Sequence, residues 1–260
     1  MSFFLPPLPP KWSAALRDVT AQRTDSRIAA AQRLGQPVDA TQVADAHDAL
    51  SRLSNDTDAR VRAAAISALG ALVEASDVVA PQPDVTEPAA DATPPLAAAP
   101  STAASLRTSI ARVLHTRLTD SATSVRELAA LGLAELGWDI AKAALVDALR
   151  SEHPEVRFQA LSAAAQSGRP EATERMLALL DDPDAFVRTA AVRAAGMLAP
   201  ATRPDGMTAK LQAALRDPAY PVRCEAGIAL ADEARPEAAD ALLEALSDPE
   251  HLLDALDVAP

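Results

Sequence analysis

The sequence predicts an all-α fold, a right-handed α-solenoid of about six to seven helical hairpins. The first observation behind this prediction is a Val-Arg pair that occurs five times, at Val61-Arg62, Val125-Arg126, Val156-Arg157, Val187-Arg188 and Val222-Arg223. The last three intervals between these pairs are 31, 31 and 35 residues, the length of one hairpin in a stacked repeat protein. The second observation is that no segment alternates apolar and polar residues with period two, so strands are not expected.

Small and aliphatic residues follow each valine at fixed offsets. Alanine is four residues later, at Ala65, Ala129, Ala160, Ala191 and Ala226, and leucine or alanine is eight later, at Leu69, Leu133, Ala164, Ala195 and Leu230. Because these offsets follow the helical period, we expect one buried stripe on the second helix of each hairpin. A sixth copy runs from Arg27 to Gly35, with Ser26 in place of the valine.

Most copies also carry an aspartate six residues before the arginine. The pairs are Asp56 with Arg62, Asp120 with Arg126, Asp182 with Arg188 and Asp217 with Arg223, while Ser151 takes this place before Arg157. An aspartate in the turn of a hairpin can cap the second helix and pair with the arginine of that helix. We therefore expect these residues to be structural.

An amphipathic stretch precedes each motif, and we interpret it as the first helix of the hairpin. The ranges are 41–53, 105–119, 139–150, 170–181, 204–216 and 236–247. Prolines support these boundaries: Pro170, Pro204 and Pro236 are at first-turn positions, and Pro183, Pro218 and Pro249 follow an aspartate in the turn.

The segment from Asp182 to Gly196 resembles the HEAT-like repeat named after phycobilisome lyases, and Asp217 to Ala231 resembles it again. The resemblance covers most of residues 25–250. It implies a curved superhelix of HEAT-like hairpins, a general capacity to bind proteins, and a ladder of the Asp and Arg residues along the turns. Proteins with such repeats include lyase subunits, scaffolds, adaptors and a branch of DNA glycosylases, so the resemblance does not select a function.

Two segments depart from the repeat and divide the chain into 1–10, 11–75, 76–105 and 106–260. Residues 76–105 contain six prolines, four acids and no base, a composition that predicts a disordered insertion between the first hairpins and the remaining ones; a decayed repeat is the alternative. Residues 1–10 form a proline-rich arm, which fits either a polyproline-II ligand or a cap over the first helix pair.

Composition and charge exclude several classes of site. The four histidines have no partner at metal-ligand spacing, and no nucleophile motif or phosphate-binding loop is present, so we expect neither an enzyme nor a cofactor or metal. The single cysteine, Cys224, fits a reducing cytoplasm, and no stretch is long enough to cross a membrane. The net charge is −12, and ten acids against Arg235 lie from Glu225 onward. Such an acidic C-terminal cap favours a basic partner segment over nucleic acid or anionic lipid; a solvated cap that keeps the end of the solenoid soluble is the alternative.

The variable positions of the second helices are the candidates for partner contact, since the second helix usually lines the inner face of such a superhelix. At offsets two, three and six from the valine, the candidates are Glu127, Leu131, Phe158, Gln159, Ser162, Thr189, Arg193 and Glu225. Phe158 and Arg193 are of the types that anchor interfaces; packing between repeats is the alternative role.

The sequence therefore favours a non-enzymatic protein-binding scaffold or adaptor that presents its inner face to another protein. One alternative is a phycobilin-lyase-like chaperone or subunit that handles a cofactor-bearing protein. The other is nucleic-acid binding in the manner of HEAT-like DNA glycosylases, which the acidic charge disfavours. The partner's identity and the oligomeric state stay open.

Overall fold

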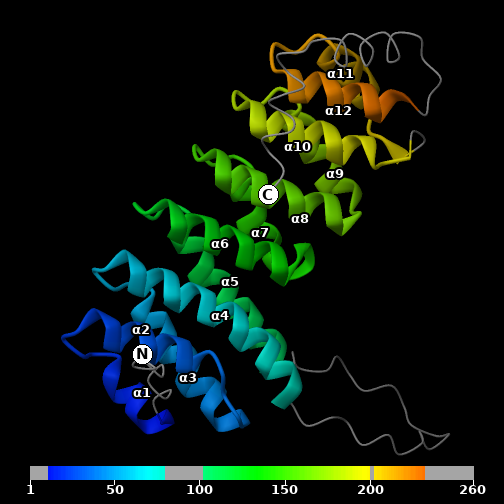
Figure 1. Ribbon diagram of the computed structural model, residues 1–260. Helices are drawn as coiled ribbons and strands as arrows, with labels where there is room; N and C mark the ends of the chain where they lie inside the picture. The colour runs from blue at the N-terminus through cyan, green and yellow to red at the C-terminus, as the bar shows by residue number, and fades with distance from the viewer. Residues whose placement is uncertain (1–10, 80–101, 200–201, 232–260) are drawn as a thin grey trace, which may run out of the picture. The chain divides into compact units, whose positions relative to one another are not determined.

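The computed structural model describes residues 11–79, 102–199 and 202–231 (Figure 1). The arm 1–10, the centre of the predicted insertion, the predicted helix 236–247 and most of the acidic C-terminal cap lie outside these residues. The described part consists of twelve helices and contains no strand, which confirms the all-α solenoid of helical hairpins. The chain divides into two compact units, unit 1 from Met1 to Ala144 and unit 2 from Leu145 to Pro260, and each is described by itself.

Unit 1 contains three hairpins and the start of a fourth. Its helices are α1 (Trp12–Asp18), α2 (Thr24–Leu34), α3 (Ala40–Leu53), α4 (Ala59–Val79), α5 (Thr102–Arg117) and α6 (Thr123–Leu136), and α7 (Trp138–Ala148) begins in this unit. The pairs α1/α2, α3/α4 and α5/α6 pack as antiparallel hairpins, and the second helices α2, α4 and α6 lie side by side (Figure 1).

Unit 2 repeats this arrangement. Its helices are the end of α7, α8 (Pro154–Ser167), α9 (Pro170–Leu179), α10 (Ala185–Gly196), α11 (Met207–Ala214) and α12 (Tyr220–Ala231). The second helices α8, α10 and α12 pack against one another, while α9 and α11 form the other layer (Figure 1).

The predicted stripe on the second helices is the core of both units. The side chains at offsets zero, four and eight of all five Val-Arg copies are fully buried: Val61, Ala65, Leu69, Val125, Ala129, Leu133, Val156, Ala160, Ala164, Val187, Ala191, Ala195, Val222, Ala226 and Leu230. Because most of these side chains are small, neighbouring helices approach closely. A Cβ added at Gly196 would be 2.7 Å from the Cβ of Ala229 on the next second helix.

Two predicted boundaries differ from the observed ones. Helix α4 continues through Val79 and α5 already begins at Thr102, so both ends of the predicted insertion 76–105 are helical. The first-turn position predicted for Pro204 is wrong, because α11 begins only at Met207. Gly206 precedes it with a φ of 83°, a conformation that favours glycine, and this turn delays the start of the helix.

Candidate partner-binding surface

The predicted side-chain pairing of Asp and Arg within one hairpin is wrong, because four of the arginines pair with the aspartate of the following hairpin. In unit 1, Arg27 binds Asp56, and Arg62 binds Asp120 with its Nε 2.8 Å from Oδ2 and its Nη2 2.7 Å from Oδ1. In unit 2, the pairs are Arg157 with Asp182 and Arg188 with Asp217. All four pairs are bidentate, so each joins two neighbouring hairpins with defined geometry.

The aspartate in the arginine's own hairpin accepts a hydrogen bond from the arginine through its main-chain carbonyl, not through its carboxylate. The Nη1 group of Arg62 donates to the carbonyl of Asp56 at 2.9 Å, and Arg126, Arg188 and Arg223 donate in the same way to Asp120, Asp182 and Asp217. Arg157 donates to the carbonyl of Ser151 at 2.7 Å, which shows why a serine is tolerated there: this contact needs no side chain. Each arginine therefore closes its own turn.

The ladder aspartates, Asp56, Asp120, Asp182 and Asp217, also organise the start of the second helices. Each accepts a hydrogen bond from the main-chain N–H two residues later, for example from Ala122 to Asp120 at 2.9 Å. Their position is two residues before the helix cap, so they form a turn before the helix rather than capping it. Burial by itself raises the pKa of Asp120, but the hydrogen bonds from Arg62 and the Ala122 N–H outweigh it and hold the pKa below 3.8.

The predicted contact residues in unit 2 are half-buried, except for Arg193, which is exposed. Phe158 on α8 packs against Phe186 on α10, with ring centroids 4.7 Å apart, and Phe186 is 62 % exposed. Arg193 on α10 donates from Nε and Nη2 to Glu225 on α12, at 3.0 Å and 2.6 Å. We call the surface of Phe158, Phe186, Arg193, Glu225 and Ile228 the second-helix face of unit 2.

The other candidates are half-buried polar side chains in unit 2 and exposed side chains in unit 1. The hydroxyls of Ser162 and Thr189 donate to carbonyls of their own helices, at 3.1 Å and 2.7 Å, and Gln159 is half-buried. In unit 1, Glu127 and Leu131 on α6 are both exposed. The structure therefore forms two separate pairs along α10: Phe158 packs on Phe186 at the start of the helix, and Arg193, about two turns further along, binds Glu225. The remaining candidates are separate positions.

Sequence reasoning missed Phe186 and Ile228 as members of this face. Ile228 is 59 % exposed and lies one turn after Glu225. Phe186 precedes Val187, so it was outside offsets counted forward from the valine, although it is one turn before Thr189 on the same side. Its residue type was the available signal, since only 3 % of the chain is aromatic.

Comparisons with known proteins agree with this architecture. Residues 48–76 match a family model of the HEAT repeat, and residues 110–196 match a model of consecutive HEAT repeats. Residues 48–76 and 110–196 of this chain are therefore HEAT repeats. No curated protein matches it in sequence.

Solved structures are similar to this chain at low identity. The X-ray structure of YibA from Escherichia coli has a TM-score of 0.60 and 18 % identity, and the match covers 95 % of this chain and 80 % of that one. The complex of CpcE and CpcF of phycocyanin lyase from Nostoc sp. PCC7120 gives a TM-score of 0.48 at 20 % identity, covering 93 % and 84 %. A designed armadillo repeat protein in complex with the peptide (KR)4 gives 0.47 at 15 %, covering 85 % and 99 %. At these identities the likeness concerns the fold.

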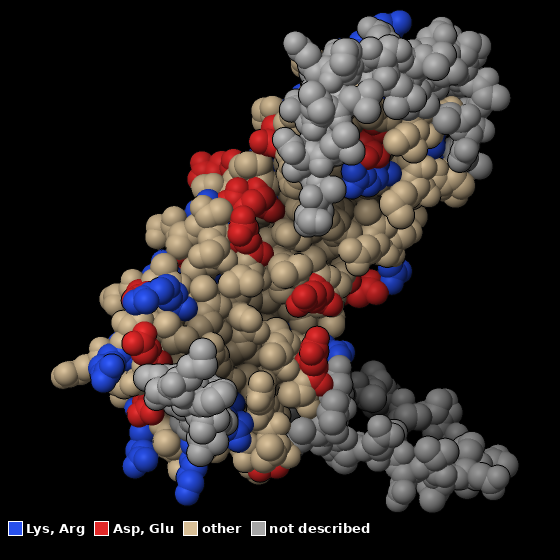
Figure 2. All heavy atoms as spheres, in the orientation of Figure 1, with Lys and Arg blue, Asp and Glu red and all other residues tan. Residues whose placement is uncertain are grey.

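The described surface of the HEAT repeats carries charges of both signs. Figure 2 shows acidic and basic side chains interspersed among neutral surface, and neither sign forms a continuous patch on the face drawn there among the described residues. The described residues contain no group of three or more His, Cys, Asp or Glu side chains that could hold a metal ion. No described helix has both the length and the apolar character needed to cross a bilayer. What this surface offers chemically is the exposed ring of Phe186, packed on the half-buried Phe158, on a repeat framework.

Proposed function

We propose that this protein is a non-enzymatic scaffold or adaptor that binds another protein through the second-helix face of unit 2. The observation that carries the proposal is the Phe158–Phe186 pair. The exposed Phe186 packs on the half-buried Phe158 of the neighbouring repeat, in a chain whose described core is mainly alanine, valine and leucine. Exposed aromatic side chains in a fixed position are typical anchors of protein interfaces.

The energy available from this pair is that of an interface anchor. An aromatic side chain buries about 200 Å², so covering the 62 % of Phe186 that is exposed would remove roughly 120 Å² from water. At about 25 cal/mol/Å² this burial contributes roughly 3 kcal/mol. Phe158 holds the ring of Phe186 in place before binding, so little side-chain freedom would be lost when a partner covers it.

Polar and aliphatic neighbours give the face the composition of an interface. Arg193 is 64 % exposed while its partner Glu225 is 17 % exposed, so the guanidinium is accessible and oriented. Ile228 adds an exposed aliphatic side chain one turn away from Glu225. Arg193 is about two helical turns after Phe186 on α10, so both side chains are on the same side of this helix. Aromatic and arginine side chains are the residue types that dominate binding at protein interfaces. The single cysteine supports a reducing compartment, and we place the protein in the cytoplasm.

Affinity capture from the native cell lysate tests the proposal. The intact chain is compared with Phe186→Ala, with Phe158→Ala combined with Arg193→Ala, and with Val38→Ala, a control whose side chain is 70 % exposed in unit 1. A protein captured by the intact chain and the control, and lost from both face variants, supports the proposal. If all chains capture the same proteins and high salt removes them, the acidic C-terminal residues bind the partner and the proposed face is wrong.

A further inference from the structure

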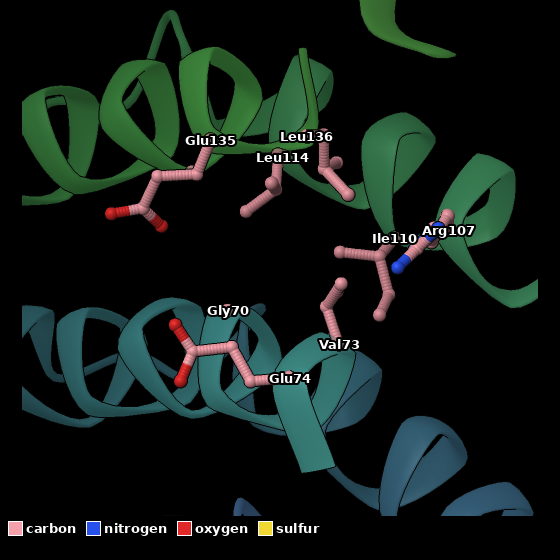
Figure 3. Close-up of a pocket in the computed structure, with 9 residues that line it drawn as sticks. Gly70, Val73, Glu74, Arg107, Ile110, Leu114, Glu135 and Leu136 are labelled. Atoms are coloured by element: carbon pink, nitrogen blue, oxygen red, sulfur yellow. The ribbon is translucent and has the colours of Figure 1, made fainter. Parts of the chain in front are cut away.

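A cavity of about 200 Å³ lies in unit 1 among α4, α5 and α6, outside the face proposed above. Figure 3 shows its polar side: the side chains of Glu74 on α4 and Glu135 on α6 extend toward the same side of the view, with Gly70 next to Glu74. Both glutamates are exposed. Within the described residues, no hydrogen bond or ion pair to another side chain is made by either carboxylate, so the two like charges share this opening without a cation between them.

The absence of a side chain at Gly70 keeps this opening free. A Cβ added there would be 3.7 Å from Oε2 of Glu135, so the carboxylate lies directly over the glycine. Glycine within a helix costs up to about 1 kcal/mol relative to alanine, and Gly70 is in the interior of α4. No close contact requires it, because 3.7 Å is an ordinary contact distance.

The remaining wall of the cavity is mainly apolar. Val73, Ile110, Leu114 and Leu136 line it behind the carboxylates (Figure 3). Arg107 lies on the side away from the carboxylates in the same view, so the negative charge is confined to the end formed by Glu74 and Glu135. The cavity thus combines an apolar channel with an anionic end.

The size and polarity of the cavity match one protein side chain. A water molecule occupies about 30 Å³, so the cavity has room for roughly six groups of that size. Lysine has a four-carbon stem that packs along apolar surface and a compact ammonium with three donors. The ammonium can bind two carboxylates on different helices, whereas the flat guanidinium of arginine is suited to one bidentate carboxylate.

We propose that this cavity is a binding site for a lysine side chain of a partner polypeptide, with the ammonium held between Glu74 and Glu135 and the stem against Val73 and Ile110. The site goes beyond the second-helix face of unit 2 and does not depend on it. It also supplies a described location for the basic partner segment that the sequence predicts from the acidic C-terminal residues alone.

Binding of a fluorescein-labelled hexalysine peptide to the full-length protein, followed by fluorescence anisotropy at low salt, tests the proposal. We expect Glu74→Gln and Glu135→Gln each to weaken binding roughly two- to fivefold, the range for a partly exposed ion pair. The matched control is Glu174→Gln, which removes the same charge from an exposed position on α9. We expect this control to bind like the unaltered protein.

A second variant separates the cavity from general electrostatics. Gly70→Leu leaves the charge unchanged, and we expect it to preserve the helical circular dichroism. Because its side chain fills the cavity, it should weaken the binding of hexalysine by a factor similar to that of Glu74→Gln. Equal weakening by Glu174→Gln, or full binding by Gly70→Leu, would overturn the proposal. The outcome is independent of the Phe186 variants, which alter unit 2.

Discussion

Replacing Asp120 by alanine removes one complete connection between neighbouring hairpins. The carboxylate accepts two hydrogen bonds from Arg62, at 2.8 Å and 2.7 Å, and a third from the Ala122 N–H at 2.9 Å. Arg117 is also close, with its Nη1 3.8 Å from Oδ2. The Arg62 and Asp120 side chains are only 11 % and 5 % exposed.

The expected loss is about 3 kcal/mol in the free energy of unfolding of unit 1. Removing one partner of a buried ion pair costs about 3–5 kcal/mol, because the remaining charge loses its compensation. The lower end applies here, since a solenoid is only two helices thick and water lies close to the guanidinium of Arg62. The double variant Arg62→Ala with Asp120→Ala should lose less than the sum of the single variants, by about 1–3 kcal/mol.

Urea unfolding followed by tryptophan fluorescence measures this loss where it occurs. Both tryptophans, Trp12 and Trp138, are in unit 1, and Trp138 is 4 % exposed in the folded protein. Because the pair joins separate hairpins, its removal weakens the coupling between repeats, so the transition should become broader as well as shift to lower urea. A loss below about 1 kcal/mol with an unchanged slope would refute the reasoning, since the pair would then act as an exposed ion pair.

Three further predictions concern the ladder, the helix contacts and the proposed face. Because the folded-state pKa of Asp120 is lowered, its contribution to stability is present above about pH 4 and is lost as the pH falls further. Between pH 5 and pH 3 the free energy of unfolding, measured by urea titration, should therefore fall less for Asp120→Asn than for the unaltered protein. Gly196→Ala should destabilise the protein by about 1–3 kcal/mol, since the added Cβ would be 2.7 Å from that of Ala229. Gly70→Ala should be neutral or stabilising, because the added Cβ has room there. Thermal unfolding compares the two variants, and equal melting temperatures would contradict the close packing at Gly196. Phe186→Ala should cost no more than about 1.5 kcal/mol of stability by urea unfolding, because the ring is 62 % exposed; a larger loss would make it a core residue.

Local helical pattern was enough to predict the core. The burial of a side chain at offsets zero, four or eight depends on the helical period and on close neighbours, and the sequence of each repeat contains both signals. All three positions of the α10 repeat, Val187, Ala191 and Ala195, are accordingly fully buried.

The sequence was enough to identify the Asp and Arg residues of the ladder. It was not enough to predict which Asp pairs with which Arg. Asp182 and Arg188 are six residues apart in the sequence, which suggested a contact within one hairpin. The actual partner of Arg188 is Asp217, 29 residues away, because the stacking of hairpins brings the next turn to the guanidinium. The direction of stacking is a tertiary property that a single repeat does not contain.

The candidate contact residues were likewise identified from the sequence, while their pairing was not. Arg193 and Glu225 were chosen as separate variable positions, and their pairing depends on the register between α10 and α12. The cavity between Glu74 and Glu135 had no sequence signal, because it combines residues of three helices on both sides of the proline-rich segment.

Site-specific photocrosslinking in the native cell tests most directly whether the second-helix face of unit 2 binds a protein. Benzoylphenylalanine replaces Phe186 in one chain and Val38, which is 70 % exposed in unit 1, in a control chain. The account predicts that irradiation joins the chain altered at 186 to a discrete protein that the control does not capture. The absence of an adduct at 186, or the same adducts from both positions, would contradict it.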